Sequence, residues 1–388
     1  MRIPLFAALS LIALASSSCS AAAVENEIVA GIVTEPTDQI TQVKIEDVAV
    51  FNEPWAMAFL PSSDSSSDSA LITEKSGKLK FWQRGKAPLN VSGVPKVDYG
   101  DQGGFGDVVL APDFADSNMV YLSWVAKGLK GTRGAVVGRA SLAFTAAGPA
   151  LQNLQIIWNQ APRVDGRGHF SHRIAFSPDG KYMFVSSGER QKFTPAQDLT
   201  NNLGKVLRLL PDGTPAPDNP FAAGARQAAE IWSYGHRNVL GLKFDARGRL
   251  WDLEHGPMGG DEINLVKRGA NYGWPLVSNG DNYDGTPIPR NATRPDLAAP
   301  AISWNPVIAP GDFIFYSGGL FAGWKGQAII AALGSQGLVR VAIDGDKARE
   351  IERISLGKRI REVEQGADGA IWILEDGEGG RLRKLTPG

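Results

Sequence analysis

The sequence predicts an all-β protein in which one antiparallel unit is repeated. Short strands of alternating apolar residues meet at Pro, Asp and Gly turns, as in RIAFSPDGKYMFVSSGE over residues 173–189. The chain holds 45 Gly and 24 Pro, which suits a turn-rich β fold. Units of this kind recur six times, at intervals of about 50 to 70 residues. Radial repetition explains that spacing, so we expect a six-bladed β-propeller with four-stranded antiparallel blades.

The six units share a strand, a tight turn and a second strand with an aromatic or aliphatic centre. They lie at residues 55–82, 107–124, 173–189, 240–256, 313–333 and 363–377. A single hairpin cannot bury both of its faces, so neighbouring units must stack. The D-G and R-G turns supply the positive φ that tight hairpins need. A β-sandwich or a pair of barrels is the alternative arrangement of the same hairpins.

The N-terminus, MRIPLFAALSLIALASSSCSAAA, joins one Arg to an apolar run and then to small residues. This pattern is typical of a secretory signal peptide and is too short to span a bilayer. We expect a signal peptide over residues 1–23, an N-terminal extension over 24–42 and one propeller domain over 43–388. The protein would then be periplasmic or secreted. Lipidation of Cys19 is the alternative fate of this leader.

Composition excludes several classes of function. The formal net charge is −1, which gives no reason to expect a nucleic-acid partner. One Cys and four His exclude a disulfide framework and a Cys-based metal site. No second apolar run is long enough to form a transmembrane segment. No dinucleotide or phosphate-binding glycine motif occurs, so nicotinamide and nucleotide cofactors are not expected.

His169 is the first candidate for chemistry. It stands in GRGHFSHRIAF, just before a predicted strand, where a loop side chain can reach a central cleft. The ordinary pKa of histidine suits a general base near neutral pH. His172 competes for this role, and a surface position for His169 is the other interpretation.

Two pairs of residues and one glutamine could hold an anionic ligand. Arg237 and Asn238 offer a planar fork and an amide. Arg359 and Arg361 have strand spacing, so their guanidinium groups share a side and repel unless an anion or carboxylates meet them. Gln102 precedes a Gly pair that lets backbone approach a ligand closely. A solvated turn and an exposed edge strand are the alternatives for the two Arg-containing pairs.

The segment HGPMGGDE, residues 255–262, is rich in oxygen donors. It combines free carbonyl groups in a tight turn with the carboxylates of Asp261 and Glu262. Hard oxygen ligands of this kind suit Ca²⁺, although the spacing is not that of an EF-hand. The alternative is a turn capped by its own Asp.

Several of these stretches together resemble one family. DQGGFGDVVLAPDFADSNMVYLSW, GHFSHRIAFSPDGKYMFVSSGE, EIWSYGHRN, LEHGPMGGDEINLVKRGANYGWP and RIREVEQGADG occur in the order found in the soluble quinoprotein glucose/sorbosone dehydrogenase family, and are most similar to its aldose sugar dehydrogenase branch. The resemblance covers residues 43–387. It implies pyrroloquinoline quinone (PQQ) and Ca²⁺ on a six-bladed propeller. The implied reaction is oxidation of an aldose sugar at its anomeric carbon to a lactone, with electrons passed to an unknown acceptor.

The resemblance also implies roles for individual residues. His169 is similar to the general base, assisted by Arg237, with hydride passing to the quinone. The implied PQQ-binding groups are Gln102, Glu189, Arg237, Asn238, Arg359 and Arg361. The implied Ca²⁺ ligands are the Gly256 and Pro257 carbonyls for one ion, and Glu262 with the Tyr272 carbonyl for a second. Glu189 stands where the glucose dehydrogenases of the family have Asp, and the Lys that contacts PQQ there is missing from residues 334–336.

Two other functions fit the same fold. A Ca²⁺-dependent propeller lactonase would need a carboxylate-rich metal site at the central channel and would not use Arg359 and Arg361. A propeller binding module without redox activity would take up no PQQ. The preferred sugar and the oligomeric state are not encoded in any motif of the chain.

Overall fold

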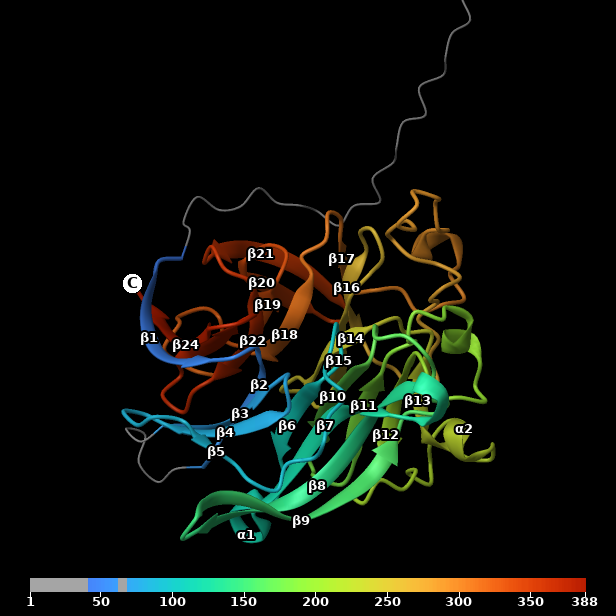
Figure 1. The fold of residues 1–388 in the computed structure, drawn as a ribbon. Helices are drawn as coiled ribbons and strands as arrows, with labels where there is room; N and C mark the ends of the chain where they lie inside the picture. The colour runs from blue at the N-terminus through green and yellow to red at the C-terminus, as the bar shows by residue number, and fades with distance from the viewer. Residues whose placement is uncertain (1–40, 62–67) are drawn as a thin grey trace, which may run out of the picture. The chain divides into compact units, whose positions relative to one another are not determined.

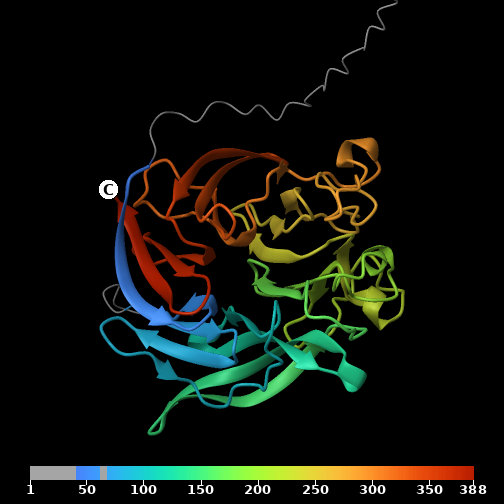
Figure 2. The same cartoon turned by 45° about the horizontal axis from the view of Figure 1, so that its top comes forward.

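The computed structural model describes residues 41–61 and 68–388. The predicted signal peptide, Cys19 and nearly all of the predicted extension lie outside these residues. Within the described part, six antiparallel four-stranded sheets are arranged in a ring (Figure 1, Figure 2). The predicted six-bladed β-propeller is therefore confirmed, and the sandwich and double-barrel alternatives are wrong. None of the helices among the described residues has the length and apolar character needed to cross a membrane.

Five blades are each built from four consecutive strands, ordered from the centre outwards as they occur in the chain. The first holds β2 (Pro54–Phe59), β3 (Ser69–Glu74), β4 (Lys78–Gln83) and β5 (Leu89–Asn90). The second holds β6 (Phe105–Leu110), β7 (Met119–Lys127), β8 (Arg133–Thr145) and β9 (Gly148–Asn159). The third holds β10 (Ser171–Phe176), β11 (Met183–Ser187), β12 (Lys205–Leu209) and β13 (Ile231–Tyr234).

The fourth and fifth blades follow the same plan. The fourth holds β14 (Val239–Phe244), β15 (Leu250–Glu254), β16 (Asp261–Leu265) and β17 (Ile302–Trp304). The fifth holds β18 (Pro310–Phe315), β19 (Ala328–Ala332), β20 (Gly337–Asp344) and β21 (Lys347–Ser355). Short helical turns lie between strands, at α1 (Phe114–Ser117), η1 (Leu129–Gly131), η2 (Thr194–Gln197), α2 (Arg226–Glu230) and η3 (Asn291–Thr293).

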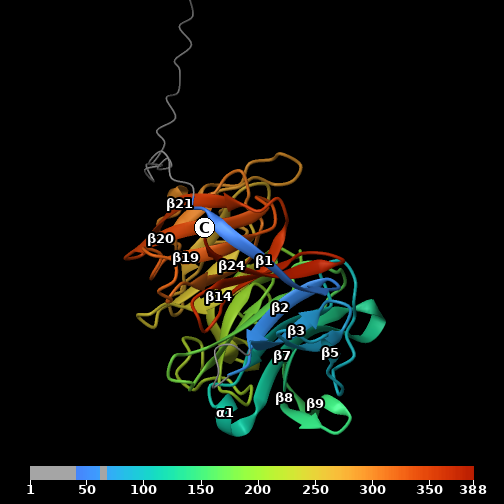
Figure 3. The ribbon, with the colours of Figure 1, turned by 90° about the vertical axis from the view of Figure 1, so that its left-hand side faces the viewer.

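The sixth blade joins the two ends of the described chain. Its strand order is β1-β24-β23-β22, with β22 (Ile360–Gln365), β23 (Ile371–Glu375) and β24 (Gly380–Pro387) followed by β1 (Val43–Phe51) as the outermost strand. Strand β1 lies beside β24 (Figure 3), and the register pairs Val43 with Pro387 and Phe51 with Gly380. Strand β1 thereby closes the ring, and it is not among the six predicted units.

The hairpin of the third blade illustrates how local sequence sets each unit. Strands β10 and β11 are buried almost throughout, since a neighbouring blade covers each face. The turn between them is held by Asp179, whose Oδ1 accepts hydrogen bonds from the Ser177 hydroxyl at 2.6 Å and the Lys181 backbone at 3.2 Å. Gly180 has φ of 70°, the left-handed conformation that the predicted D-G turn requires.

The apolar core is divided into layers between neighbouring blades. One layer packs Leu71 of β3 against Val108 of β6 and Leu122 of β7. Another packs Val137 of β8 against Val185 of β11. These strands read as nearly continuous apolar runs because both faces of the sheet are covered.

Arg173 of β10 links all six innermost strands at the centre of the ring. Its side chain is 2 % exposed, and its guanidinium lies 4.0 Å from the ring of Trp55 on β2. Its other partners lie one on each remaining inner strand: Asp107 (3.3 Å), the Leu240 carbonyl (2.7 Å), the Gly311 carbonyl (3.0 Å) and Glu362 (2.7 Å). Removing either partner of such a buried ion pair would leave an uncompensated charge in the core and would strongly destabilise the fold.

Candidate active site

The predicted site residues gather where the innermost strands begin, a face of the ring that we call the entry face. Gln102 precedes β6, His169 precedes β10, and Arg237 with Asn238 precedes β14. The loops are joined by backbone hydrogen bonds, for example from the Glu189 N–H to the Arg237 carbonyl at 3.0 Å. The fold therefore brings together residues that are up to about 140 positions apart, as a central channel lined by several blades permits.

His169 and Glu189 form a hydrogen-bonded pair on the entry face. His169 Nδ1 lies 2.5 Å from Glu189 Oε1, and the His169 backbone N–H donates to Gln102 Oε1 at 2.7 Å. The second oxygen of Glu189 accepts from the backbone N–H groups of Lys192 and Phe193 at 2.5 and 2.6 Å. The carboxylate is thus fixed at both oxygens and fixes the imidazole in turn, which leaves Nε2 as the ring nitrogen available to a substrate.

The surroundings keep this imidazole neutral at pH 7. Burial lowers the pKa of His169 below its ordinary value, the hydrogen bond to Glu189 acts against this, and the nearby Arg237 lowers it further. For Glu189, burial acts to raise the pKa, but the hydrogen bond with His169, the backbone hydrogen bond from Phe193 and the nearby charge of Arg237 act against it, and the pKa is lowered. The pair is therefore an ionised carboxylate beside a neutral imidazole, the arrangement that a general base needs.

The two loops that carry this pair contain a cluster of strained backbone. Six non-glycine residues there have positive φ: His169 (48°), Ser171 (57°), His172 (66°), Arg190 (64°), Gln191 (58°) and Phe193 (62°). Each such residue costs roughly 1–3 kcal/mol, and strain of this kind concentrates at functional sites. Arg190 offsets the cost by donating to the Gly166 and Gly168 carbonyls at 2.7 and 2.9 Å, which pins the loop before His169.

His172 does not compete for the role of base. It is 3 % exposed and stacks on Trp55 with ring centroids 5.3 Å apart. Its Nδ1 lies 2.8 Å from the hydroxyl of Ser123, and burial lowers its pKa to about 3. Gly106 makes room for this ring, since a Cβ there would lie 1.9 Å from it. His172 is a packed core residue.

Arg237 and Asn238 face the pair from the next blade. Arg237 donates to the His255 carbonyl at 3.2 Å and to the Tyr283 hydroxyl at 3.3 Å. Its Nε is buried and has no hydrogen-bond partner among the described residues. Asn238 Oδ1 accepts from the Ser171 hydroxyl at 3.2 Å. A buried N–H group without a hydrogen-bond acceptor is unfavourable, so an acceptor from outside the chain would stabilise this side chain.

Arg359, directly before β22, and Arg361, on β22, both reach one carboxylate, as their spacing predicts. Asp376 accepts from Arg359 Nε at 2.9 Å and from Arg361 Nε and Nη2 at 2.9 and 2.8 Å. One carboxylate meets two guanidinium groups, so an excess of one positive charge remains. The Arg359 side chain is 52 % exposed and that of Arg361 only 12 %. An added anion would complete this group.

Arg359 and Asp376 also line a cavity of about 340 Å³ between the fifth and sixth blades. Gln336 and Lys358 lie on the same cavity. The Lys that the resemblance leads one to expect near residues 334–336 is thus absent, but an ammonium group reaches the same cavity from the start of β22. The primary sequence gives no sign of this, because the two positions lie in different loops, one before β20 and one before β22.

The four predicted metal-binding residues, Gly256, Pro257, Glu262 and Tyr272, all line one cavity of about 20 Å³. This is the space of one water molecule or one ion. The resemblance divides the four between two Ca²⁺ ions, whereas this cavity has the size of one. Burial, and then the charge of Glu254, raises the pKa of Glu262 well above its usual range. Glu254 lines the cavity as well, so hard oxygen donors surround it.

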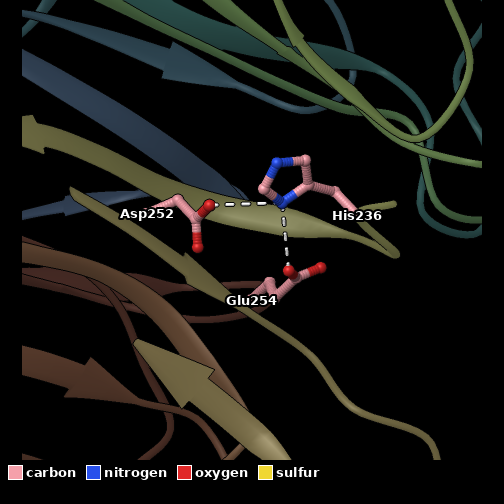
Figure 4. Close-up of side chains that lie close together, drawn as sticks. All are labelled: His236, Asp252 and Glu254. Carbon is pink, nitrogen blue, oxygen red and sulfur yellow. Dashed lines mark hydrogen bonds and ion pairs between the residues drawn. The ribbon is translucent and has the colours of Figure 1, made fainter. Parts of the chain in front are cut away.

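Behind this cavity lies a buried group that sequence reasoning did not find. His236 Nδ1 is 3.2 Å from both Asp252 Oδ2 and Glu254 Oε1 (Figure 4). Its Nε2 lies 2.8 Å from the hydroxyl of Ser233, and its ring stacks on Tyr272 at 4.6 Å. Glu254 also accepts from the Arg237 backbone at 2.6 Å. This group therefore braces the loop that carries Arg237.

Two further residues were missed. Asp376 follows β23 in the sequence EDGEG. Only the pairing of β23 with β22 shows that this carboxylate is the partner of Arg359 and Arg361. Tyr283, 75 % exposed, lies on the loop after Asp281, whose length was the one available signal. Both contacts join segments of one blade that are about 15 to 46 positions apart in the chain, so they leave no local pattern in sequence.

Comparison with known proteins agrees with this geometry. The family model for glucose/sorbosone dehydrogenases matches residues 51–384. An aldose sugar dehydrogenase of Escherichia coli strain K12 is 40 % identical over 347 residues, which cover 87 % of this chain and 90 % of that protein. The apo crystal structure of the soluble aldose sugar dehydrogenase from Escherichia coli superimposes with a TM-score of 0.84 at 38 % identity, covering 89 % of this chain and all of that one.

A quinoprotein glucose dehydrogenase of Acinetobacter calcoaceticus is 30 % identical over 250 residues, which cover 58 % of this chain and 51 % of that protein. The family match spans all six blades, including the loops that carry His169, Glu189 and Arg237. The predicted family is therefore confirmed. The chain belongs to the glucose/sorbosone dehydrogenase family of oxidoreductases.

Proposed function

We propose that this protein is a PQQ- and Ca²⁺-dependent aldose sugar dehydrogenase that oxidises the anomeric carbon of an aldose to a lactone. The observation that carries the proposal is the His169–Glu189 pair, a neutral imidazole held at 2.5 Å by an ionised carboxylate beside Arg237. The names of the relatives support the substrate class and the quinone. The predicted leader over residues 1–23 supports a periplasmic or secreted location.

The residues of the entry face fit PQQ, a planar quinone with three carboxylates. Arg237 Nε is buried with no hydrogen-bond partner in residues 41–61 and 68–388, and Arg359 and Arg361 together carry one positive charge more than Asp376 neutralises. Gln102 and Asn238 add amide groups. Glu189 is hydrogen-bonded to His169 and therefore lies beside the same site. Guanidinium groups bind carboxylates strongly and in fixed geometry.

The cavity lined by Gly256, Pro257, Glu262 and Tyr272 fits Ca²⁺. It offers carboxylate and carbonyl oxygens in a volume of about 20 Å³. The buried carboxylates of Glu262 and Glu254 both line this cavity and repel each other, and a divalent cation would relieve that repulsion. These residues would hold the ion through their side chains or carbonyl groups.

The chain's own residues divide the work of proton transfer. His169 Nε2 accepts the proton of the anomeric hydroxyl, because Nδ1 is engaged by Glu189. Glu189 stabilises the imidazolium that forms and keeps the ring in one orientation. Arg237 keeps the pKa of His169 low, so that the base is unprotonated before each turnover. When bound, PQQ supplies the two-electron acceptor and Ca²⁺ a Lewis acid.

The lactonase alternative needs carboxylates free to bind a metal at the central channel. Asp312, Glu362 and Glu364 do lie close together there. However, the ammonium of Lys243 is 3.1 Å from Asp312 and 3.0 Å from Glu364, and Glu362 is paired with Arg173. Cations of the chain already occupy this group, which favours the dehydrogenase.

A reconstitution assay tests the proposal. Purified protein is incubated with PQQ and Ca²⁺, then given a panel of aldoses and an uncharged redox dye. We expect sugar-dependent dye reduction that requires both PQQ and Ca²⁺ and falls about 10²–10⁴-fold in His169→Gln. PQQ binding followed by absorbance is the control, and it should be retained in this variant. Failure of the wild type to bind PQQ would overturn the proposal.

A further inference from the structure

Five basic side chains gather on the entry face, and three of them pair with one carboxylate, Asp98. Arg167 Nη2 lies 3.4 Å and Lys127 Nζ 4.0 Å from Asp98 Oδ1, and Arg133 Nε bonds to Asp98 Oδ2. Arg163 donates to the Lys127 carbonyl at 2.8 Å. Lys130 lies in η1, between Lys127 and Arg133. We call this group the basic rim: Lys127, Lys130, Arg133, Arg163 and Arg167.

The basic rim carries a large local excess of charge. Among the described residues, Asp98 is the one carboxylate that pairs with any of its members. Five positive charges against one negative charge leave an excess of four. The nearby Asp165 adds nothing, since it pairs with Lys192 at 2.9 Å. The whole chain has a formal charge of −1, so this excess belongs to one part of the surface.

An exposed apolar side chain lies within the basic rim. Leu129, next to Lys130, is 87 % exposed at the tip of the loop. Tyr99 is 46 % exposed and its carbonyl accepts from Arg167 at 3.0 Å, while its hydroxyl donates to Glu53, a carboxylate that lies 3.8 Å from Lys75. Apolar residues ringed by charge are the usual composition of a small docking surface, where charge steers the encounter and apolar contact holds it briefly.

The basic rim is bonded directly to the loops of the proposed active site. Gln102, whose side chain binds the His169 backbone, donates its own N–H to the Arg167 carbonyl at 3.2 Å. Arg190, the neighbour of Glu189, donates to the Arg133 carbonyl at 2.7 Å. A partner seated on the rim would therefore lie close to the reacting centre. Electron transfer needs this, because its rate falls steeply with distance.

We propose that the basic rim docks an acidic electron-acceptor protein, which removes the electrons of sugar oxidation. That the partner accepts electrons from sugar oxidation rests on the proposed function. That the partner is acidic rests on the positive charge of the basic rim. Oxidation of one aldose to its lactone releases two electrons and two protons. A one-electron acceptor takes one electron at each encounter, so two encounters complete each turnover and both protons pass to solvent. Charge-steered, short-lived binding suits this repeated exchange.

Two forms of one cytochrome serve as matched probes. Native cytochrome c is basic, and cytochrome c with succinylated lysines is acidic, while both carry the same haem. The rate constant for their reduction is measured with the PQQ- and Ca²⁺-loaded enzyme and saturating aldose. At about 0.01 M salt we expect the acidic form to react at least tenfold faster. At about 0.15 M, where the Debye length falls to roughly 8 Å, the difference should shrink.

Charge reversal locates the effect. In Lys127→Glu/Lys130→Glu the excess of four positive charges falls to zero, and the preference for the acidic cytochrome should disappear. Both lysines are exposed, and neither touches His169 or Glu189. The matched control is Lys86→Glu/Lys181→Glu, with the same change in charge at exposed turns at the other ends of the blades. The control should keep the preference.

Equal rates for the two cytochromes, or the same loss of preference in the control variant, would overturn the docking proposal. The uncharged dye shows separately whether sugar oxidation occurs at all. If it does not, the proposed function fails, and calorimetric titration of the PQQ-free protein with each cytochrome still decides the surface. Binding selective for the acidic form and lost in the reversed variant supports docking; equal binding or none refutes it.

Discussion

At the scale of single residues, Glu189 controls the proposed base. It holds His169 at 2.5 Å, and its charge and hydrogen bond are the main influences that raise the pKa of that imidazole against burial. In Glu189→Gln the amide can still bond to the ring, but the charge that stabilises the imidazolium is lost. We expect kcat to fall about 10²-fold or more, and by a larger factor than the affinity for PQQ. A fall in PQQ affinity of the same size would instead assign Glu189 to cofactor binding alone.

The pH dependence follows from the same two residues. The base is active when unprotonated, and burial places the pKa of His169 below its ordinary value of 6.5. The acid limb of the kcat/KM profile should therefore lie below pH 6.5, with a plateau above it. Removing the Glu189 charge lowers this pKa further, so the limb of Glu189→Gln should move to lower pH. A limb that moves upward in the variant would contradict the assignment of His169 as base.

His169, Arg237 and the Arg359–Arg361 pair could be identified as candidate site residues because each is a polar residue at or near the start of an apolar strand. Asp376 and Tyr283 could not, because they reach these residues from other strands or from a long loop. The choice between His169 and His172 also needed the structure. Three positions apart in the chain, one faces the entry face and the other is packed under Trp55.

At the scale of the elements, the alternating hairpins identified the inner strands of every blade. Two of the outermost strands were harder to find, since β5 has two residues and β17 three, too few for a pattern to develop. The inner strands depend on each other through Arg173, a contact that no periodicity indicates. Arg173 is buried and has four carbonyl and carboxylate partners. Replacing it therefore tests how much this contact stabilises the inner strands.

Replacing Arg173 by Met keeps much of the side-chain volume and removes the charge. Asp107 and Glu362 would then remain buried without their guanidinium partner. We expect the free energy of unfolding to fall by about 3–5 kcal/mol, as when one partner of a buried ion pair is removed. Urea denaturation measures the change, and the exposed Lys181→Met should stay within about 0.5 kcal/mol of the wild type. Equal stability of both variants would show that the central group is dispensable.

At the scale of the whole molecule, the ring is closed by pairing the two ends of the described chain. This could not be predicted from local sequence, because Val43 and Pro387 are partners at opposite ends of the propeller. Strand β1 contributes more than hydrogen bonds. Phe51 is buried, and Val48 and Ala49 pack on the cluster that contains Trp372 and Leu382.

Deleting residues 1–51 would leave β24 as an open strand edge next to exposed apolar surface. Such edges pair with other chains, so we expect the shortened protein to aggregate and to unfold at a lower urea concentration than the wild type. Deletion of residues 1–40 is the matched control, because it keeps β1 and the bond from Gly388 to the Gln42 carbonyl and should give a monodisperse protein of unchanged stability. Light scattering and urea denaturation distinguish the two. If the longer deletion behaved like the shorter one, five complete blades and a three-stranded sixth would suffice, and closure by β1 would not be what stabilises the ring.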